Sequence, residues 1–323
     1  AYDRLSYDEC ARNLFRSGIY YGDSYLDAFT GLGFQAAQVV PDCEPLQKKW
    51  ATERKLELPP KWSSRAPFRW WWTRRFGCTP DHWVRERVLL DQIEFHRPRF
   101  LWFFSGTPID ARLLRRCREF ADHLVLWWAC PLVEGVPYAE FDLVLSGIAD
   151  LVDYFRGLGI NAALVSHAFD DRVLQRIQPT RPRLPKVAFV GAASPHHVER
   201  LRLLDLLARN VEVEIYWSGW DFLPEDSPIA QSYRGPALGD HVYQVYGSCA
   251  GAGHHNIHLA GRTLSAKRHF EATGMGACVL AQEPTDKEGL FQPGCEIVTY
   301  ETQEDCLQKA RHLVENLEEA ERI

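Results

Sequence analysis

The sequence predicts an α/β chain made of two successive doubly wound units, which would face each other across a cleft. With 323 residues the chain is about twice the usual size of one domain. Short apolar runs alternate with helix-length amphipathic segments, which is typical of parallel sheets wrapped by helices. Three prolines interrupt this alternation at residues 178–185. We therefore expect an N-terminal Rossmann-like domain over residues 1–177, a hinge at about 178–185, and a C-terminal Rossmann-like domain over 178–323 whose last helix could pack back on the first.

The first half of the chain contains apolar runs of strand length and amphipathic runs of helix length. The expected strands are Gln35–Val40, Arg99–Phe104, His123–Trp128, Phe141–Ser146 and Ala162–Ser166. The expected helices are Tyr25–Leu32, Asp81–Phe95, Ile109–Phe120 and Ala149–Leu158. Gly33 and Gly159 follow two of these helices, where a left-handed C-terminal cap is expected.

The second half repeats the pattern. The expected strands are Val187–Val190, Val211–Trp217, Ile257–Leu259, Ala277–Ala281 and Glu296–Tyr300. The expected helices are His197–Leu207, His241–Cys249, Leu264–Thr273, Lys287–Phe291 and Gln303–Asn316. Ligands of such sheets bind beyond the carboxyl ends of the strands, so the loops that follow the strands are the places to search.

Composition limits the classes of protein. The formal net charge of -6 provides no basic field for nucleic acid. No apolar run reaches the length of a membrane span, and the N-terminus lacks a signal-peptide pattern, so we expect a cytoplasmic protein. The nine cysteines form no C-x-x-C pair, which indicates reduced thiols and makes a zinc site improbable. The charged final segment could also mean that the chain is part of a longer multidomain protein.

The first loop of the C-terminal half reads VAFVGAASPHHVER. Gly191 would let the backbone turn closely, and a helix beginning after Ser194 would offer free amides to an anion. The loop lacks the G-x-G-x-x-G pattern, which disfavours a nicotinamide dehydrogenase. His197 and Arg200 could face the ligand, although a plain strand–turn–helix corner with a solvated helix face explains the same residues.

A second loop, IYWSGWDF, places Ser218 and Gly219 at the end of another buried strand. Trp217 and Trp220 could stack on a base or a sugar, and they could equally belong to the core.

The stretch from residue 257 to 300 is the most informative. Ser265 would begin or cap a helix that carries Lys267, Arg268 and Glu271. The helix start and the two cations suit a diphosphate, and the Glu271 carboxylate could accept two ribose hydroxyls. Glu271 could instead only pair with Lys267 one turn earlier.

The runs RHFEATGMGA at 268–277 and LFQPGCEIV at 290–298, followed by Tyr300, closely resemble the C-terminal signature of the CgeB-like glycosyltransferases. These are similar to the group-1 enzymes of the GT-B fold. FVGAASPHHVERLRLL resembles the family's first C-domain loop, and LGFQAAQVVPDCEPLQKKWA resembles its N-domain opening. The resemblance spans nearly the whole chain.

The resemblance implies a GT-B fold, a nucleotide-sugar donor held by the C-domain, an acceptor on the N-domain and no required metal or other cofactor. Glu271 matches the ribose-binding glutamate, Arg268 the donor-phosphate end and Gly191 the glycine loop. Group-1 enzymes often carry a second glutamate eight residues earlier, and this chain has Thr263 there. This leaves the sugar and the stereochemical outcome open, with retention as our expectation for a hexosyl- or deoxyhexosyl-transferase.

In the N-terminal half, Ser105, Gly106 and Ser146 follow buried strands and would line the cleft. His167 and Asp170 follow the last of these strands and could touch donor or acceptor, although a lone histidine is more often structural.

The segment Arg65–Phe76 interleaves arginines with aromatic residues. Such a segment suits a peripheral membrane contact, a glycan or lipid-linked acceptor, or a loop packed over the sheet.

Two functions follow. The first is a glycosyltransferase of polysaccharide or glycoconjugate synthesis, in which Arg268 and Lys267 neutralise the departing diphosphate and His167 assists. The second is a catalytically silent GT-B-like module that binds glycans within a larger assembly. Thr263 favours the second function, whereas Arg268 and Glu271 favour the first.

Overall fold

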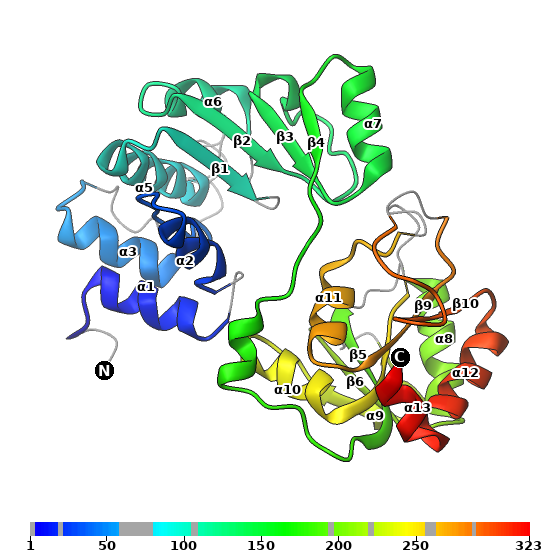
Figure 1. Cartoon of the computed structure of the whole chain (residues 1–323). Coiled ribbons are helices and arrows are strands. Elements are labelled where there is room, and N and C mark those ends of the chain that lie inside the picture. Colours follow the sequence, from blue (N-terminus) through cyan, green and yellow to red (C-terminus); the bar gives the residue numbers. More distant parts are fainter. Residues whose placement is uncertain are drawn as a thin grey trace. The chain divides into compact units, whose positions relative to one another are not determined.

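The computed structural model describes residues 4–18, 22–57, 80–104, 109–192, 197–218, 223–255, 263–285 and 289–323 (Figure 1). The chain forms two compact units. The first comprises Ala1–Trp128, Leu132–Leu145 and Val152–Ala163, and the second comprises Ala129–Pro131, Ser146–Leu151 and Leu164–Ile323. Residues 164–177, which the sequence places in the first domain, thus group with the second unit.

The first unit contains a four-stranded sheet in the order β1-β2-β3-β4. Its strands are β1 (Phe100–Phe104), β2 (His123–Trp127), β3 (Leu143–Ser146) and β4 (Ala162–Leu164). The helices between and before them are α5 (Pro80–His96), α6 (Ala111–Cys117) and α7 (Ala149–Gly157). Strands β1, β2 and β3 pair in parallel, as their alternation with helices predicts.

The N-terminal part of the first unit is helical and differs from the prediction. The helices are α1 (Tyr7–Arg16), α2 (Ser24–Gly31) and α3 (Glu44–Glu53). A capping box between Ser6 and Glu9 begins α1, whose apolar face packs against α3. The strand expected at Gln35–Val40 is wrong: these residues are irregular, and only Val40 is buried, against that helical cluster.

The second unit contains a six-stranded sheet in the order β10-β9-β8-β5-β6-β7. The strands are β5 (Leu184–Ala192), β6 (Val213–Ser218), β7 (Tyr233–Gly235), β8 (Cys249–Gly253), β9 (Cys278–Gln282) and β10 (Val298–Tyr300). All the neighbouring strands pair in parallel. The chain runs outward from β5 to β7 and then returns to build the other side from β8 to β10. The order therefore reverses between β5 and β8, where ligands of doubly wound sheets bind.

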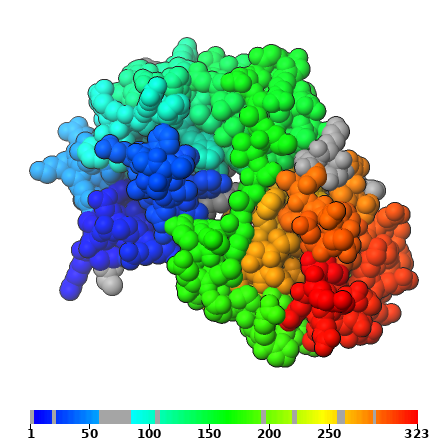
Figure 2. Space-filling model, in the orientation of Figure 1, coloured from blue at the N-terminus to red at the C-terminus, as the bar shows by residue number. Residues whose placement is uncertain are grey.

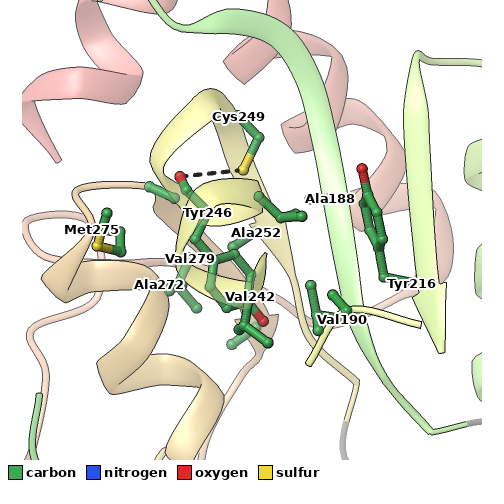
Figure 3. Close-up of a cluster of buried hydrophobic side chains, with 14 of the residues drawn as sticks. Ala188, Val190, Tyr216, Val242, Tyr246, Cys249, Ala252, Ala272, Met275 and Val279 are labelled. Atoms are coloured by element: carbon green, nitrogen blue, oxygen red, sulfur yellow. Dashed lines mark hydrogen bonds between the residues drawn. The ribbon is translucent and has the colours of Figure 1, made fainter. Parts of the chain in front are cut away.

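Helices cover both faces of this sheet. They are α8 (Val198–Ala208), α9 (Pro228–Ser232), α10 (Asp240–Ser248), α11 (Lys267–Gly274), α12 (Gln303–Glu315) and α13 (Leu317–Arg322). Consecutive residues of β5 point to opposite faces: Ala188 packs with α10 and α11 (Figure 3), whereas Phe189 packs with α8 and α12. This alternation produces two apolar cores, one on each side of the sheet.

The C-terminal helix α13 lies at the surface of the second unit (Figure 2, red). Its Ala320 packs with Ala250 of β8 and Cys278 of β9. The last helix is thus anchored on the sheet of its own unit. None of the helices in the described ranges has both the length and the apolar character of a membrane span.

Two predictions in the second half fail or fall outside the described residues. The expected strand Ile257–Leu259 lies outside them, and the strand at this place in the order is β8, which the sequence analysis did not predict. Of the expected helix Lys287–Phe291, the described residues 289–291 are not helical.

Candidate functional site

The start of α11 lies at the edge of the sheet where the strand order reverses, because α11 follows β8 in a parallel unit. The helix begins at Lys267, and its N-cap Ala266 offers no side-chain hydrogen bond. Ser265 therefore does not cap the helix, contrary to the prediction. Its hydroxyl accepts a 2.8 Å hydrogen bond from Thr263, whose own oxygen accepts one from the Ser265 amide, in a buried local turn.

Three predicted site residues meet on the first turns of α11. Nζ of Lys267 lies 3.0 Å from Oε1 of Glu271, and Nη1 of Arg268 lies 2.6 Å from its Oε2. Both carboxylate oxygens are thus paired, each with one cation. The Glu271 side chain is only 4% exposed, whereas about a third of each cation reaches the surface, at 31% and 32%. The pairing that the sequence left as an alternative is therefore present, and it includes Arg268 as well.

The electrostatics of this cluster extend to two tyrosines of α10. Burial is the largest influence on the pKa of Arg268 and works to lower it, but the charge and hydrogen bond of Glu271 and the two tyrosines together outweigh it, so that pKa is raised. Burial and then the Glu271 charge raise the pKa of Tyr243. Burial also raises the pKa of Tyr246. Both phenols therefore stay neutral beside the ion cluster and can donate hydrogen bonds.

His167 lies beside this cluster, on the segment that follows β4. Its pKa is lowered to about 4, first by burial and next by the charge of Lys267, with Glu271 opposing. Its ring contacts that of Phe270 at 6.4 Å between centroids. His167 is thus a neutral imidazole at physiological pH. The other residue predicted here, Asp170, pairs with Arg172 at 2.6 Å and caps a short 3-10 helix.

Arg200, the third residue of α8, has a structural role that neither sequence interpretation expected. Its guanidinium is buried over the ring of Phe189 and donates to the carbonyl oxygens of Ala192, at 2.7 Å, and His255, at 2.6 Å. It therefore joins the ends of β5 and β8. These contacts use one donor from each of its nitrogens, so three of its five N–H groups hold the backbone, and its contact with the ligand stays a prediction.

The other residues of the first loop are only partly described. Gly191 lies within β5 rather than in the turn after it, and a Cβ there would come 3.1 Å from the Phe189 ring. The glycine thus makes room for packing. His197 is the half-buried N-cap residue of α8, which begins at Val198, and Ser194 lies outside the described residues.

The remaining predicted positions divide between surface, core and undescribed segments. Ser218 is exposed at the end of β6, whereas Trp217 is 1% exposed and belongs to the core. Ser146 is buried, and its hydroxyl accepts from the amide of Ile148. The positions outside the described residues are Gly219, Trp220, Ser105, Gly106 and Arg65–Phe76.

The sequence analysis missed three histidines at the same edge of the sheet. His254 and His255 follow β8, and His269 is the third residue of α11. The rings of His254 and His269 lie 4.3 Å apart between centroids. Nδ1 of His269 donates to the carbonyl of Leu264 at 2.7 Å. A pair of histidines directly after a run of small residues was the available signal. Within the described ranges, no group of three His, Cys, Asp or Glu side chains is placed to hold a metal ion.

The C-terminal part of the chain matches a known family. Residues 199–323, which include the cluster on α11, match the sequence model of a family described as glycosyl transferase-like. No curated protein matches the chain in a sequence comparison.

Several solved structures resemble the chain. HepE from Anabaena, solved with UDP and glucose, is 13% identical over 73% of this chain and 74% of its own, with a TM-score of 0.50. A glycosyltransferase from Rickettsia africae is 12% identical over 86% and 80%, with a TM-score of 0.52. An α-glucosyltransferase bound to UDP-glucose and DNA is 9% identical over 73% and 76%, with a TM-score of 0.53. The chain therefore has the GT-B fold, an α/β architecture of two Rossmann-like domains.

Proposed function

We propose that the protein is a glycosyltransferase that moves a sugar from a nucleotide-sugar donor to a glycan, lipid-linked or protein acceptor. The observation that carries the proposal is the ion cluster of Lys267, Arg268 and Glu271 at the start of α11. It lies at the ligand-binding edge of a doubly wound sheet, within the residues that match the glycosyl transferase-like family. The resemblance to structures that hold UDP or UDP-glucose supports a uridine nucleotide as the first donor to test.

The cluster can perform two tasks. Each oxygen of the Glu271 carboxylate keeps a lone pair beyond its contact with one cation, so it can accept a ribose hydroxyl. Lys267 and Arg268, together with the amides of the first helical turn, can neutralise the diphosphate as it leaves. Glu271 then also holds the two cations in place, which makes it both a ligand and an organiser of the site.

Replacement of Glu271 by glutamine tests the proposal. The amide keeps the shape of the side chain but removes the charge, and the loss of a charged hydrogen bond costs roughly 1.5–3 kcal/mol. We expect the Kd for UDP, measured by calorimetry, to rise roughly 10- to 150-fold. Alanine is a poorer choice, because it would also empty the volume of a buried side chain.

The control is Asp305→Asn, which breaks an ion pair with Lys309 on α12 that has the same i,i+4 spacing as Lys267 and Glu271. It should leave the affinity for UDP unchanged. A folded Glu271→Gln protein that binds UDP as tightly as the wild type would remove the ribose assignment.

Arg268→Ala separates the diphosphate from the nucleoside. The variant should lose affinity for UDP but much less for uridine, because the guanidinium faces the phosphates in the proposed complex. An equal loss for both ligands would indicate that Arg268 only supports the helix.

The reaction is proposed to need no metal ion, with the phosphate charge met by side-chain cations and the helix dipole. Turnover should therefore persist in excess chelator. Loss of turnover that magnesium or manganese restores would contradict this part of the proposal.

A catalytically silent glycan-binding module is the alternative, and Thr263 favours it because a carboxylate is often found at this position in similar enzymes. Thr263 is buried and bound to Ser265, so its hydroxyl serves the turn before α11. Hydrolysis or transfer with any member of a panel of nucleotide sugars would decide for the enzyme.

A further inference from the structure

The last residue of α11, Gly274, is packed against an aromatic ring from another part of the chain. A Cβ atom at Gly274 would lie 2.2 Å from Cγ of Phe169 and 2.4 and 2.5 Å from its two Cδ atoms. Carbon atoms in contact are normally about 3.5–4.0 Å apart. The ring of Phe169 therefore occupies the place of a side chain on the helix, and only glycine permits this.

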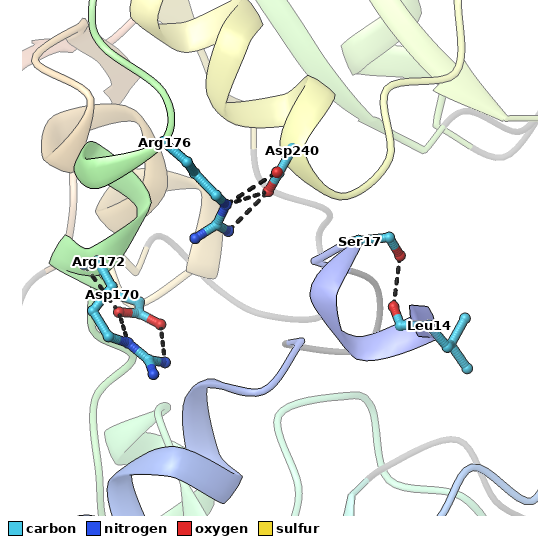
Figure 4. A network of polar contacts seen from close by, with 6 residues as sticks. All are labelled: Leu14, Ser17, Asp170, Arg172, Arg176 and Asp240. Carbon is cyan, nitrogen blue, oxygen red and sulfur yellow. Dashed lines mark hydrogen bonds and ion pairs between the residues drawn. The ribbon is translucent and has the colours of Figure 1, made fainter. Parts of the chain in front are cut away.

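Phe169 belongs to the segment that leads from β4 into the second unit, and this segment is attached to its unit at successive points. The ring of Phe169 packs on the core beside Tyr243 of α10, at 6.1 Å between centroids. Farther on, Arg176 forms a two-pronged ion pair with Asp240 of α10, while Arg172 pairs with Asp170 inside the segment (Figure 4). The contact with Gly274 attaches the segment to α11 two residues after His167, whose own ring contacts Phe270 of the same helix.

We propose that Phe169 and Gly274 are positioning residues for the donor site, because the ring seated on α11 holds the His167 imidazole beside Lys267 and Glu271. Each member of the pair is close in sequence to a group of the site. Phe169 lies two residues after His167, and Gly274 lies three residues after Glu271. A shift of the ring would move His167 relative to the ion cluster. The catalytic consequence rests on the proposed function, whereas the placement of His167 does not.

The chemistry that this placement provides follows from the neutral state of His167. A neutral imidazole offers one donor and one acceptor nitrogen. Next to Lys267 it can thus bind a sugar hydroxyl or a phosphate oxygen without adding another positive charge to the cluster. Released from α11, the same side chain would become more exposed and protonate at a higher pH.

Gly274→Ala is the direct test, and the chain provides a matched control. Gly157 is the last residue of α7, as Gly274 is of α11, but no atom lies within 4 Å of a Cβ built there. In Gly274→Ala we expect the His167 pKa, followed by NMR and assigned with His167→Asn, to rise from about 4 toward 6.5. We expect kcat/KM with UDP-sugar to fall roughly tenfold or more, since small misplacements in a site are costly. Gly157→Ala should change neither.

Two further variants keep the test decisive if Gly274→Ala folds poorly. Phe169→Ala removes the ring, keeps the glycine and should raise the His167 pKa in the same direction. In Phe169→Ala/Gly274→Ala the new methyl group meets no ring, so the double variant should behave like Phe169→Ala alone. Additive losses would overturn the proposed pairing.

The outcomes also separate this inference from the proposed function. If the wild type shows no transfer, the NMR titration alone decides whether Phe169 and Gly274 position His167. A His167 pKa that stays at about 4 in both Gly274→Ala and Phe169→Ala would overturn the inference, even if the protein proves to be a glycosyltransferase.

Discussion

Helices α7 and α11 end in the same way but are packed differently. Each closes with two glycines around one apolar residue, Gly157-Leu158-Gly159 in α7 and Gly274-Met275-Gly276 in α11. The second glycine has a left-handed φ in both, +75° and +70°. In both, the amide after that glycine donates to the carbonyl five residues earlier, which is the usual closing bond of such an end.

The surroundings of these residues are opposite. Leu158 is 60% exposed, and a Cβ on either glycine of α7 would meet open space. Met275 is fully buried, and a Cβ on Gly276 would come within 2.7 Å of the buried guanidinium of Arg183. In α7 these residues thus only end the helix. In α11 they end the helix and also pack closely in the core next to the candidate site.

The largest expected difference in stability between the two helix ends is at the apolar residue between the two glycines. Met275→Ala should lower the free energy of unfolding by about 2–5 kcal/mol, because it empties a fully buried volume. Leu158→Ala should stay within about 0.5 kcal/mol of the wild type, as surface substitutions do. Denaturant unfolding of both variants measures the contrast, and equal losses would contradict it.

Substitution of the second glycine should also destabilise the two helix ends to different extents. Gly159→Ala should cost about 1–2 kcal/mol, which is the strain of a left-handed residue with a Cβ. Gly276→Ala adds the clash with Arg183, so its cost should exceed that of Gly159→Ala by about 1 kcal/mol or more. The same unfolding measurement applies, and a smaller loss for Gly276→Ala would show that Arg183 moves freely.

Burial of α11 also predicts a dependence on pH. Burial lowers the pKa of His269 to about 4, below the ordinary value of 6.5. Because the unfolded chain then binds more protons between these values, stability should fall as the pH drops from 6.5 to 4, by at most about 3 kcal/mol. His269→Asn, which keeps a donor for the Leu264 carbonyl, should flatten this part of a thermal-melting series. An unchanged slope would assign the effect to other groups.

The first glycine of α7 should give a small gain in stability. Gly157→Ala should raise the free energy of unfolding by about 0.4–1 kcal/mol, because alanine restricts the unfolded chain and meets no atom in the fold. The same substitution at Gly274 should destabilise. A gain at both positions would mean that Phe169 is not fixed against the helix.

These contrasts also show what the sequence could and could not predict. Strands β1 to β6, β9, β10 and most helices were predictable, because their apolar periodicity is a local property. Strand β8, CAGAG, lacks the large β-branched residues typical of strands. Its small residues are explained by the neighbouring strand, since a Cβ on Gly251 would meet Val187 of β5 at 3.2 Å. The run at Gln35–Val40 looked like a strand but has no pairing partner in the described fold.

The candidate site was likewise predictable from the sequence only in part. The cluster of Lys267, Arg268 and Glu271 was predictable, because spacings of three and four residues place side chains together on any helix. The role of Arg200 was not, since it depends on carbonyl groups of two separate strand ends. The contact between Phe169 and Gly274 joins residues 105 positions apart, so no local pattern could indicate it.

The contacts of Arg183 affect how the second unit unfolds locally. Its buried guanidinium donates to the carbonyls of Tyr246 and Cys249 at the end of α10, and of Met275 at the end of α11. Neither helix can unwind at that end without leaving a buried charge with too few acceptors. Helices α10 and α11 should therefore open as one cooperative unit, and their amide hydrogens should exchange with solvent at a common, slow rate.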